Sequence, residues 1–193
     1  IIAGRASSAD LAGLAVGTAF ATTIWMFFSG VIFSVTPIVA QLYGAKKYIE
    51  IGQKIREILW IALFLGILIF LMFMNMGLIL KFFPIDTNIT EISVDYLKAV
   101  AIGATFITVF TCLRCYSEGM TLTKPVFYIA FAGMLINIPL DLMFVYGYLG
   151  APKLGGVGCG IATSIVNFLM MIIMFLYIAS VSYTHLRAHE TTC

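Results

Sequence analysis

The residues of this sequence that could do chemistry lie in a stretch that is otherwise apolar. Residues 134–147 read MLINIPLDLMFVYG and include Asn137 and Asp141, four positions apart. A helix places residues at this spacing on one face, one turn apart. A carboxylate within an apolar span costs roughly 2.5–3.5 kcal/mol on insertion scales, so it is retained where it faces a protein interior or a watery cavity. The pair therefore indicates a cation or proton site, in which the Asn137 amide helps to hold the charge.

A third candidate ligand lies in a later apolar run. Thr163 and Asn167 share one face of residues 157–180. A hydrogen bond between helices is the ordinary role for each, and ion coordination is the alternative. For Asn137 and Asp141, the corresponding alternative is a buried hydrogen bond that only ties the helices together. Asp141, Asn137 and Thr163 are the candidate cation- or proton-binding residues.

Other pairs of metal-binding side chains carry weaker signals. Cys112 and Cys115 form a single CxxC, and His185 and His189 are four apart without a third ligand nearby. We expect the cysteines to be small apolar helix residues, with metal or redox chemistry as the less favoured alternative. The spans contain no HExxH motif, no paired catalytic carboxylates and no Ser–His constellation. We therefore predict neither an enzyme nor a metal cofactor; Na⁺ or H⁺ would enter only as a coupling ion.

The elements that must position these residues are membrane helices. The 193 residues are 62% hydrophobic and 10% charged, with a mean hydropathy of +1.06. A soluble domain is nearer 45–50% apolar and about 25% charged, so this composition predicts a membrane protein. The apolar runs are continuous and not alternating, which favours an all-α transmembrane helix bundle over a barrel. The net charge of +2 is too small to indicate a nucleic-acid partner.

The hydropathy pattern predicts five complete spans after the stub of a sixth, and Pro37 is expected to bend the end of the first. The spans are residues 11–40, 58–80, 94–115, 125–148 and 157–180. Residues 41–57 mix cations with isoleucines and predict a short amphipathic helix at the surface, or a solvated loop. Their cations (Lys46, Lys47, Lys54 and Arg56) mark the cytoplasmic side, and the acidic loop after residue 80 fits the outer side.

The two ends of the sequence differ from the spans between them. The sequence starts at Ile1 without a methionine, in what reads as the last turn of an earlier helix. At Val181 the composition changes abruptly from apolar to polar, so residues 181–193 are expected to be a non-native tail. We therefore expect a piece of a longer protein.

Several motifs resemble the multidrug and toxic compound extrusion (MATE) family, in its NorM-type bacterial branch. They are LTKP at 122–125, NIPLD at 137–141, FVYG at 144–147 and GAPKLGGVGCGIAT at 150–163. PIVAQLYGA at 37–45 is similar to the end of that family's second helix. The resemblance extends over essentially residues 1–178, and its specific part is 137–163.

The resemblance implies that residues 1–180 are part of an N-terminal transmembrane lobe, helices 2–6 of a fold built from two six-helix lobes. It implies a secondary active multidrug efflux antiporter that exports cationic or amphipathic drugs in exchange for Na⁺ or H⁺. Such a protein would cross the bacterial cytoplasmic (inner) membrane several times. Its partners would be small-molecule drugs, the lipid bilayer and the C-terminal lobe, and this fragment alone is expected to be inactive.

The resemblance also bears on the site. Asn137 and Asp141 match polar positions on helix five of the family, whose site also uses an Asp on helix one, expected about two residues before Ile1. NorM-type members often carry Asn where Asp141 stands, and this leaves the coupling ion open. The alternative function is a lipid-linked oligosaccharide flippase of the same superfamily. It would need a strongly cationic cavity, and the spans contain no run of Arg.

Overall fold

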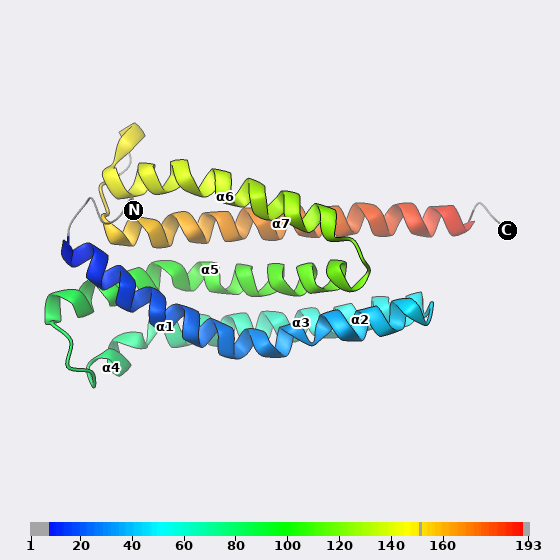
Figure 1. The fold of residues 1–193 in the computed structure, drawn as a ribbon, viewed down its shortest axis with the longest axis horizontal. Helices are drawn as coiled ribbons and strands as arrows, with labels where there is room; N and C mark the ends of the chain where they lie inside the picture. Colours follow the sequence, from blue (N-terminus) through cyan, green and yellow to red (C-terminus); the bar gives the residue numbers. More distant parts are fainter. Residues whose placement is uncertain (1–7, 151, 191–193) are drawn as a thin grey trace.

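A computed structural model of the chain is an antiparallel bundle of long helices (Figure 1). It describes residues 8–150 and 152–190, with residues 149 and 181–190 described by their backbone alone. Five helical segments are long and apolar enough to cross a membrane, which confirms the predicted transmembrane bundle. The elements are α1 (Ser8–Phe33), α2 (Val35–Gly44), α3 (Tyr48–Met74), α4 (Met76–Leu80), α5 (Thr87–Gly119), α6 (Thr123–Tyr146), the 3₁₀ turn η2 (Tyr148–Gly150) and α7 (Gly156–Glu190).

Helix α5 is the centre of the bundle. Figure 1 shows α6 and α7 on one side of it and α1 and α3 on the other. The apolar window of α5 is 61% buried, whereas the windows of the other spans are 17–28% buried. Helix α5 is therefore shielded from solvent and lipid, and the other helices pack around it.

Small residues let α5 and α7 approach closely. A Cβ atom added to Gly103 would lie 2.7 Å from Ser164 Cα, so only glycine fits there. The Ser164 hydroxyl donates a hydrogen bond to the Ala99 carbonyl (2.8 Å) and accepts one from the Gly103 amide (3.2 Å). In lipid, helix association rests on such packing and hydrogen bonds rather than on hydrophobicity.

Two of the spans are interrupted. The first breaks at Ser34, between α1 and α2, three residues before Pro37. Proline has no amide hydrogen, and its ring clashes with the carbonyl four residues earlier, here that of Phe33. The predicted bend near Pro37 is confirmed. The second span breaks at Asn75, whose side-chain amide donates to the Leu71 carbonyl (2.8 Å), and α4 follows.

The predicted separate surface helix within residues 41–57 is wrong. From Tyr48 onward, this stretch is the beginning of α3, which continues to Met74 without a break. Ile51 is buried beside Val39 and Cys115 and anchors these first turns to the bundle. The ion pairs Lys47–Glu50 (3.0 Å) and Lys54–Glu57 (2.7 Å) lie on exposed side chains of the same helix.

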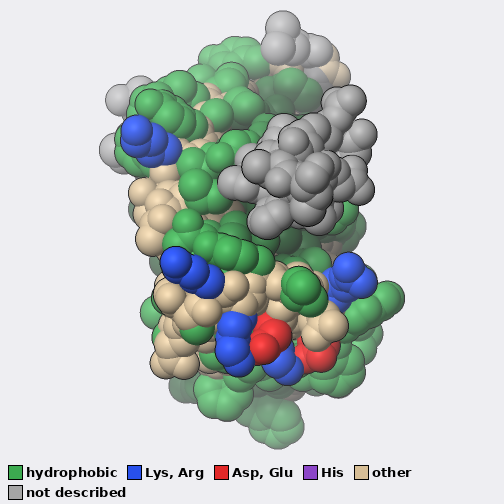
Figure 2. Space-filling view, turned by 90° about the vertical axis from the view of Figure 1, so that its right-hand side faces the viewer, with side chains coloured by type: hydrophobic (Ala, Val, Ile, Leu, Met, Phe, Trp, Pro, Cys, Tyr) green, Lys and Arg blue, Asp and Glu red, His purple; other side chains and the backbone are tan. Residues whose placement is uncertain are grey.

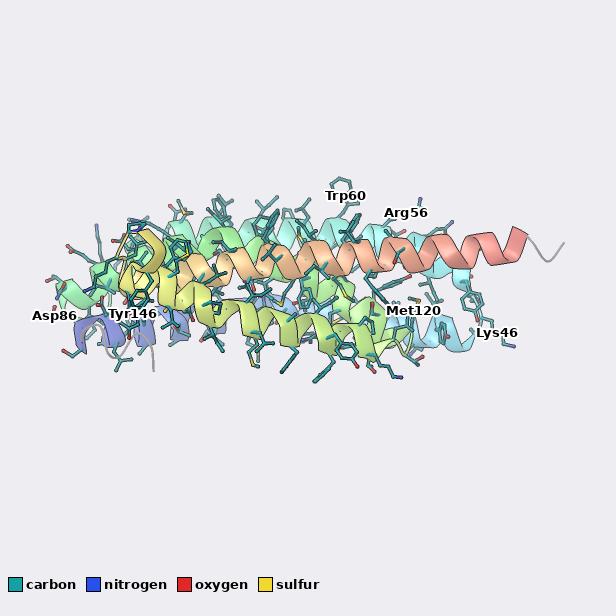
Figure 3. All side chains as sticks on the ribbon, turned by 90° about the horizontal axis from the view of Figure 1, so that it is seen from above. Lys46, Arg56, Trp60, Asp86, Met120 and Tyr146 are labelled. Atoms are coloured by element: carbon teal, nitrogen blue, oxygen red, sulfur yellow. The ribbon has the colours of Figure 1, made fainter. Side chains whose placement is uncertain are left out.

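The two ends of the bundle carry different charges. We call the end with Lys46, Arg56 and Met120 the basic end, and the end with Asp86 and Tyr146 the acidic end (Figure 3). Figure 2 looks onto the basic end, where Lys and Arg side chains gather around a few acidic ones. The loop joining α2 to α3 and the loop joining α5 to α6 both lie at the basic end, as the predicted in–out threading requires.

The backbone of α7 continues past Val181 to Glu190, so the compositional change does not end the helix. Residues 1–7, 151 and 191–193 lie outside the described residues, and so do the side chains of His185 and His189. The non-native origin of residues 181–193 and the helix stub at Ile1 stay predictions.

Substituting Gly103→Ala tests the α5–α7 contact. The added methyl group would meet Ser164 backbone and side chain at once, so we expect a loss of about 1–3 kcal/mol, typical of overpacking. The measurement is the temperature at which half of a detergent-solubilised fluorescent fusion aggregates. Gly30→Ala is the matched control, because a Cβ atom at Gly30 meets nothing within 4 Å. Equal melting of the two variants would contradict the packing described.

Candidate cation site

Asp141 lies on α6, about one turn before that helix ends at Tyr146, near the acidic end of the bundle. Pro139 interrupts the hydrogen-bond ladder just before it, because the carbonyl of Leu135 receives no bond from a proline nitrogen. The Asp141 side chain is half-buried and faces α7. The predicted carboxylate therefore points between helices and does not project freely from the bundle.

The two carboxylate oxygens of Asp141 have different surroundings. The thiol of Cys159 on α7 lies close to the carboxyl group. Oδ1 is buried and has no hydrogen-bond partner among the described residues. A buried carboxylate oxygen without a donor costs free energy, so this atom needs a proton, a water molecule or a cation.

Tyr96 of α5 is the other ionisable group close to Asp141. It is buried and lies within electrostatic reach of both the Asp141 carboxyl and the Cys159 thiol. Its hydroxyl accepts a hydrogen bond of 3.4 Å from Thr18 on α1. A Cβ atom on Gly17 would lie 2.7 Å from the tyrosine ring, so α1 packs directly on it. Side chains of four helices thus meet around Asp141.

The register of α6 against α7 relates Asn137 to Thr163. Gly133 faces Val166 and Met170, and Asp141 faces Cys159, so the antiparallel pair brings Asn137 level with Thr163. Both side chains are half-buried. Within the described residues, neither has a side-chain hydrogen bond, and Asn137 is not bonded to Asp141. In the described part of the chain, a direct hydrogen bond between Asn137 and Asp141 is thus absent, and the Cys159 thiol on α7 is the polar group close to Asp141.

The neighbours of Thr163 have structural roles. Asn167 donates to the Gly103 carbonyl (3.4 Å) and is buried, so the expected interhelical hydrogen bond is what the structure has at this residue. Ser164, which sequence reasoning passed over, makes the two α5 contacts described above. The periodic pattern of α7 places both on the side toward α5. Thr163 lies on the side toward α6 and remains a candidate ligand.

Sequence reasoning also passed over Cys159 and Tyr96. A cysteine among glycines and a tyrosine near a helix start carry no signal of their own. Only the meeting of α5, α6 and α7 reveals their roles. Cys112 and Cys115 differ from Cys159, because both are buried in an apolar cluster with Ile32, Val35 and Ala62.

A hollow of about 560 Å³ lies between α4 and the first turns of α5. Asn75, Lys81, Glu91 and Asp95 line it with six other residues, and none of the three candidate ligands does. In the part of the chain that the structure describes, no three His, Cys, Asp or Glu side chains gather closely enough to hold a metal. The candidate site therefore consists of the helix contacts around Asp141.

Residues 1–143 match the model of the MatE family, which is nearly three quarters of the sequence. This chain belongs to the MatE family. The match includes Asn137 and Asp141 and ends before Thr163.

Two solved structures resemble the MatE chain along most of its length. One, named "protein C", superposes with a TM-score of 0.78 at 30% identity. The other is the MATE transporter NorM-NG in a complex that includes a monobody, and it has a TM-score of 0.69, also at 30% identity. Each covers 92% of this chain, and this chain covers 39% of each. The sequence thus corresponds to well under half the length of these relatives.

Stability measurements separate structural polar residues from candidate ligands. Ser164→Ala removes two contacts to α5 and is expected to cost about 0.6–1.7 kcal/mol, the range of hydrogen bonds between membrane helices. Asn137→Ala should leave stability nearly unchanged, because its amide has no partner in the described structure. The melting temperature of each detergent-solubilised variant is the measurement. A loss of stability for Asn137→Ala as large as that for Ser164→Ala would show that Asn137 has a structural role.

Proposed function

We propose that this MatE chain is part of a secondary active antiporter that exports cationic or amphipathic drugs in exchange for Na⁺ or H⁺. The observation that supports this proposal is the Asp141 carboxylate, held between helices with one buried oxygen unpartnered among the described residues. Ionisable groups within membrane-spanning helices commonly mark ion or proton pathways. Asn137 and Thr163, level with each other one turn away, supply further oxygen ligands.

The proposed mechanism couples two sites through α6. An ionised Asp141 attracts a cation, and capture of Na⁺ or H⁺ neutralises the charge. The loss of charge changes the packing of α6 on α7, and α6 bends at Pro139, where its ladder is already interrupted. The bend alters the drug-binding surface, so cation entry lowers drug affinity. Such coupling requires that each ligand favour a different arrangement of the same element.

The proposed location is the bacterial cytoplasmic membrane. The basic end faces the cytoplasm, since cytoplasmic loops carry an excess of Lys and Arg. Asp141 then lies toward the outer face, from which a coupling cation enters. The drug cavity takes walls from the C-terminal lobe, so transport is a property of the full-length protein. Its substrates are small-molecule drugs, and its other partner is the lipid bilayer.

The flippase alternative needs a strongly cationic cavity to hold a lipid-linked phosphate. Arg114 on α5 lies near the basic end and is paired with Glu118 (Nε to Oε1 3.3 Å). This pairing neutralises its charge, and the antiporter is the better supported of the two proposals.

Asp141→Asn in the full-length parent tests the antiporter. The variant keeps the size and polarity of the side chain but cannot be neutralised by a cation. We expect cation-dependent ethidium efflux from cells to fall at least tenfold, with normal protein in the membrane. Asp95→Asn is the matched control, because Asp95 is an exposed acid paired with Lys98 at 3.3 Å. Undiminished efflux by Asp141→Asn would remove Asp141 from the mechanism. Running the assay with and without a sodium gradient distinguishes Na⁺ from H⁺.

Labelling tests the proposed orientation. Single cysteines replace Lys47 at the basic end and Asp86 at the acidic end in a cysteine-free full-length parent. In intact spheroplasts, a membrane-impermeant maleimide should label position 86 several times faster than position 47. Permeabilised cells should label both positions, which serves as the control. The reverse order would invert the proposed topology.

A further inference from the structure

We propose that the hollow beside α4 binds the headgroup of a zwitterionic phospholipid, with Lys81 at its phosphate and Glu91 at its primary ammonium group. The hollow has a volume of about 560 Å³ and lies where α3 ends and α4 begins, beside the first turns of α5 (Figure 1). Small-molecule sites typically occupy roughly 300–1,000 Å³, so this space is large enough for a headgroup. The hollow is separate from the contacts around Asp141, and the inference does not depend on the proposed antiport.

The charges that line the hollow sum to zero. Lys81 and Lys98 contribute two positive charges. Glu91 and Asp95 contribute two negative ones. A ligand with a net charge would leave one sign unbalanced at this site, whereas a zwitterion satisfies both. The lining therefore favours a molecule that carries an anionic and a cationic group close together.

Two of these four side chains are available to a ligand. Lys98 and Asp95 already form an ion pair with each other, one turn apart on α5 (Nζ to Oδ1 3.3 Å). The ion pairs among the described residues include neither Lys81 nor Glu91, although both border the same hollow. Lys81 directly follows α4 and Glu91 belongs to α5, so a ligand between them would join the two elements.

The uncharged polar side chains of the hollow hold the backbone in place. The Asn75 side-chain amide donates to the Leu71 carbonyl (2.8 Å), at the break between α3 and α4. The Thr90 hydroxyl donates to the Asp86 carbonyl (3.0 Å), in the first turn of α5. These bonds give the walls defined positions and leave recognition of the ligand to the two unpaired charges.

The hollow lies next to apolar side chains that no other part of the described chain covers. Leu78 lines the hollow and is 63% exposed, and Phe82, immediately after Lys81, is 89% exposed. Toward the middle of the bundle, Leu71 on α3 and Ile102 on α5 are also exposed. The acyl chains of a lipid can lie on these surfaces, which a soluble zwitterion would leave uncovered. Basic pockets between membrane helices bind anionic headgroups, and the balanced charge here suits a zwitterionic one.

The carboxylate of Glu91 favours a primary ammonium group. A carboxylate accepts hydrogen bonds from N–H donors, and such charge-assisted bonds are about twice as strong as neutral ones. A trimethylated ammonium group has no N–H to donate. Glu91 therefore distinguishes phosphatidylethanolamine from phosphatidylcholine, while Lys81 attracts the phosphate of either lipid as a point charge.

Native mass spectrometry of the full-length parent tests this site. Detergent-purified protein is titrated with dioleoyl phosphatidylethanolamine, phosphatidylcholine or phosphatidylglycerol, and the affinity for the first bound lipid is measured. We expect phosphatidylethanolamine to bind about threefold more tightly than the other two, the scale of an exposed charge pair. Lys81→Gln should weaken the binding of all three lipids. Glu91→Gln should lower phosphatidylethanolamine to the level of phosphatidylcholine and strengthen phosphatidylglycerol, because it removes a negative charge near the phosphate.

The matched control is Lys124→Gln, which removes an exposed lysine at the start of α6, at the basic end, and should leave all three affinities unchanged. Equal binding of the three lipids by the wild type, or an unchanged preference in Glu91→Gln, would overturn the proposal. Soluble phosphoethanolamine carries the same two charged groups without acyl chains. If it displaced the lipid at equal concentration, the ligand would be a soluble zwitterion and the lipid assignment would be wrong.

A measurement on the unmodified protein does not depend on the folding of any variant. A ligand that binds the native state raises its melting temperature. Phosphatidylethanolamine should therefore raise the melting temperature of the wild type more than equal concentrations of the other two lipids, and an equal rise with all three would overturn the proposal. Asp141→Asn should keep this preference, because Asp141 does not line the hollow. Failure of the antiport proposal would thus leave the lipid site standing, and failure of the lipid site would leave the antiport proposal standing.

Discussion

The Ser164 hydroxyl joins α7 to α5 through the Ala99 carbonyl and the Gly103 amide, and the position of α6, which packs mainly on α7, depends on this contact. Lipid is as apolar as leucine, so burying leucine provides little driving force within a membrane. Two helices stay together there because their backbones come close and their polar groups find partners. Asn167, one turn further along α7, adds a third hydrogen bond between the two helices by donating to the Gly103 carbonyl.

Helix α6 is positioned through α7. Gly133 gives room to Met170, and Gly158 lies against the backbone of Phe144, so the two helices approach closely at two separate points of their contact. Between these points, the register brings Asp141 to Cys159. The half-buried carboxylate thus results from packing that begins at Ser164, on the neighbouring helix. The position of the charged residue is therefore determined by residues that pack the helices together.

Much of this arrangement follows from the sequence because hydropathy is a strong signal. Five apolar runs predict five spanning helices, and Pro37 predicts the break that the structure has at Ser34. The pair Asn137 and Asp141 stands out because polar groups are rare within such runs. The cations of the Lys-rich loops predict that these loops share one side, and the loops joining α2 to α3 and α5 to α6 lie at the same end of the bundle.

The rest depended on contacts between distant segments. Residues 41–57 look like a surface helix because their charges are conspicuous, yet Ile51 attaches them to the bundle and α3 continues through them. The same limit applies at the site. Asn137 is next to Asp141 along one helix face, but the thiol that lies close to the acid belongs to Cys159, eighteen positions later. The spacing of residues within one helix does not determine which residues of α7 face which residues of α6.

The Asp141 side chain lies on a helix that packs mainly against a single neighbour. The apolar window of α6 is only 17% buried, the lowest value among the five spans, and the extensive contact of α6 is with α7. Pro139 interrupts its backbone ladder two residues before the carboxylate. In the proposed mechanism, this helix, which is held mainly along one interface and already weakened at one point, bends when the charge at that interface changes. The central helix α5, buried and fixed on several sides, provides the stationary frame against which such a movement would occur.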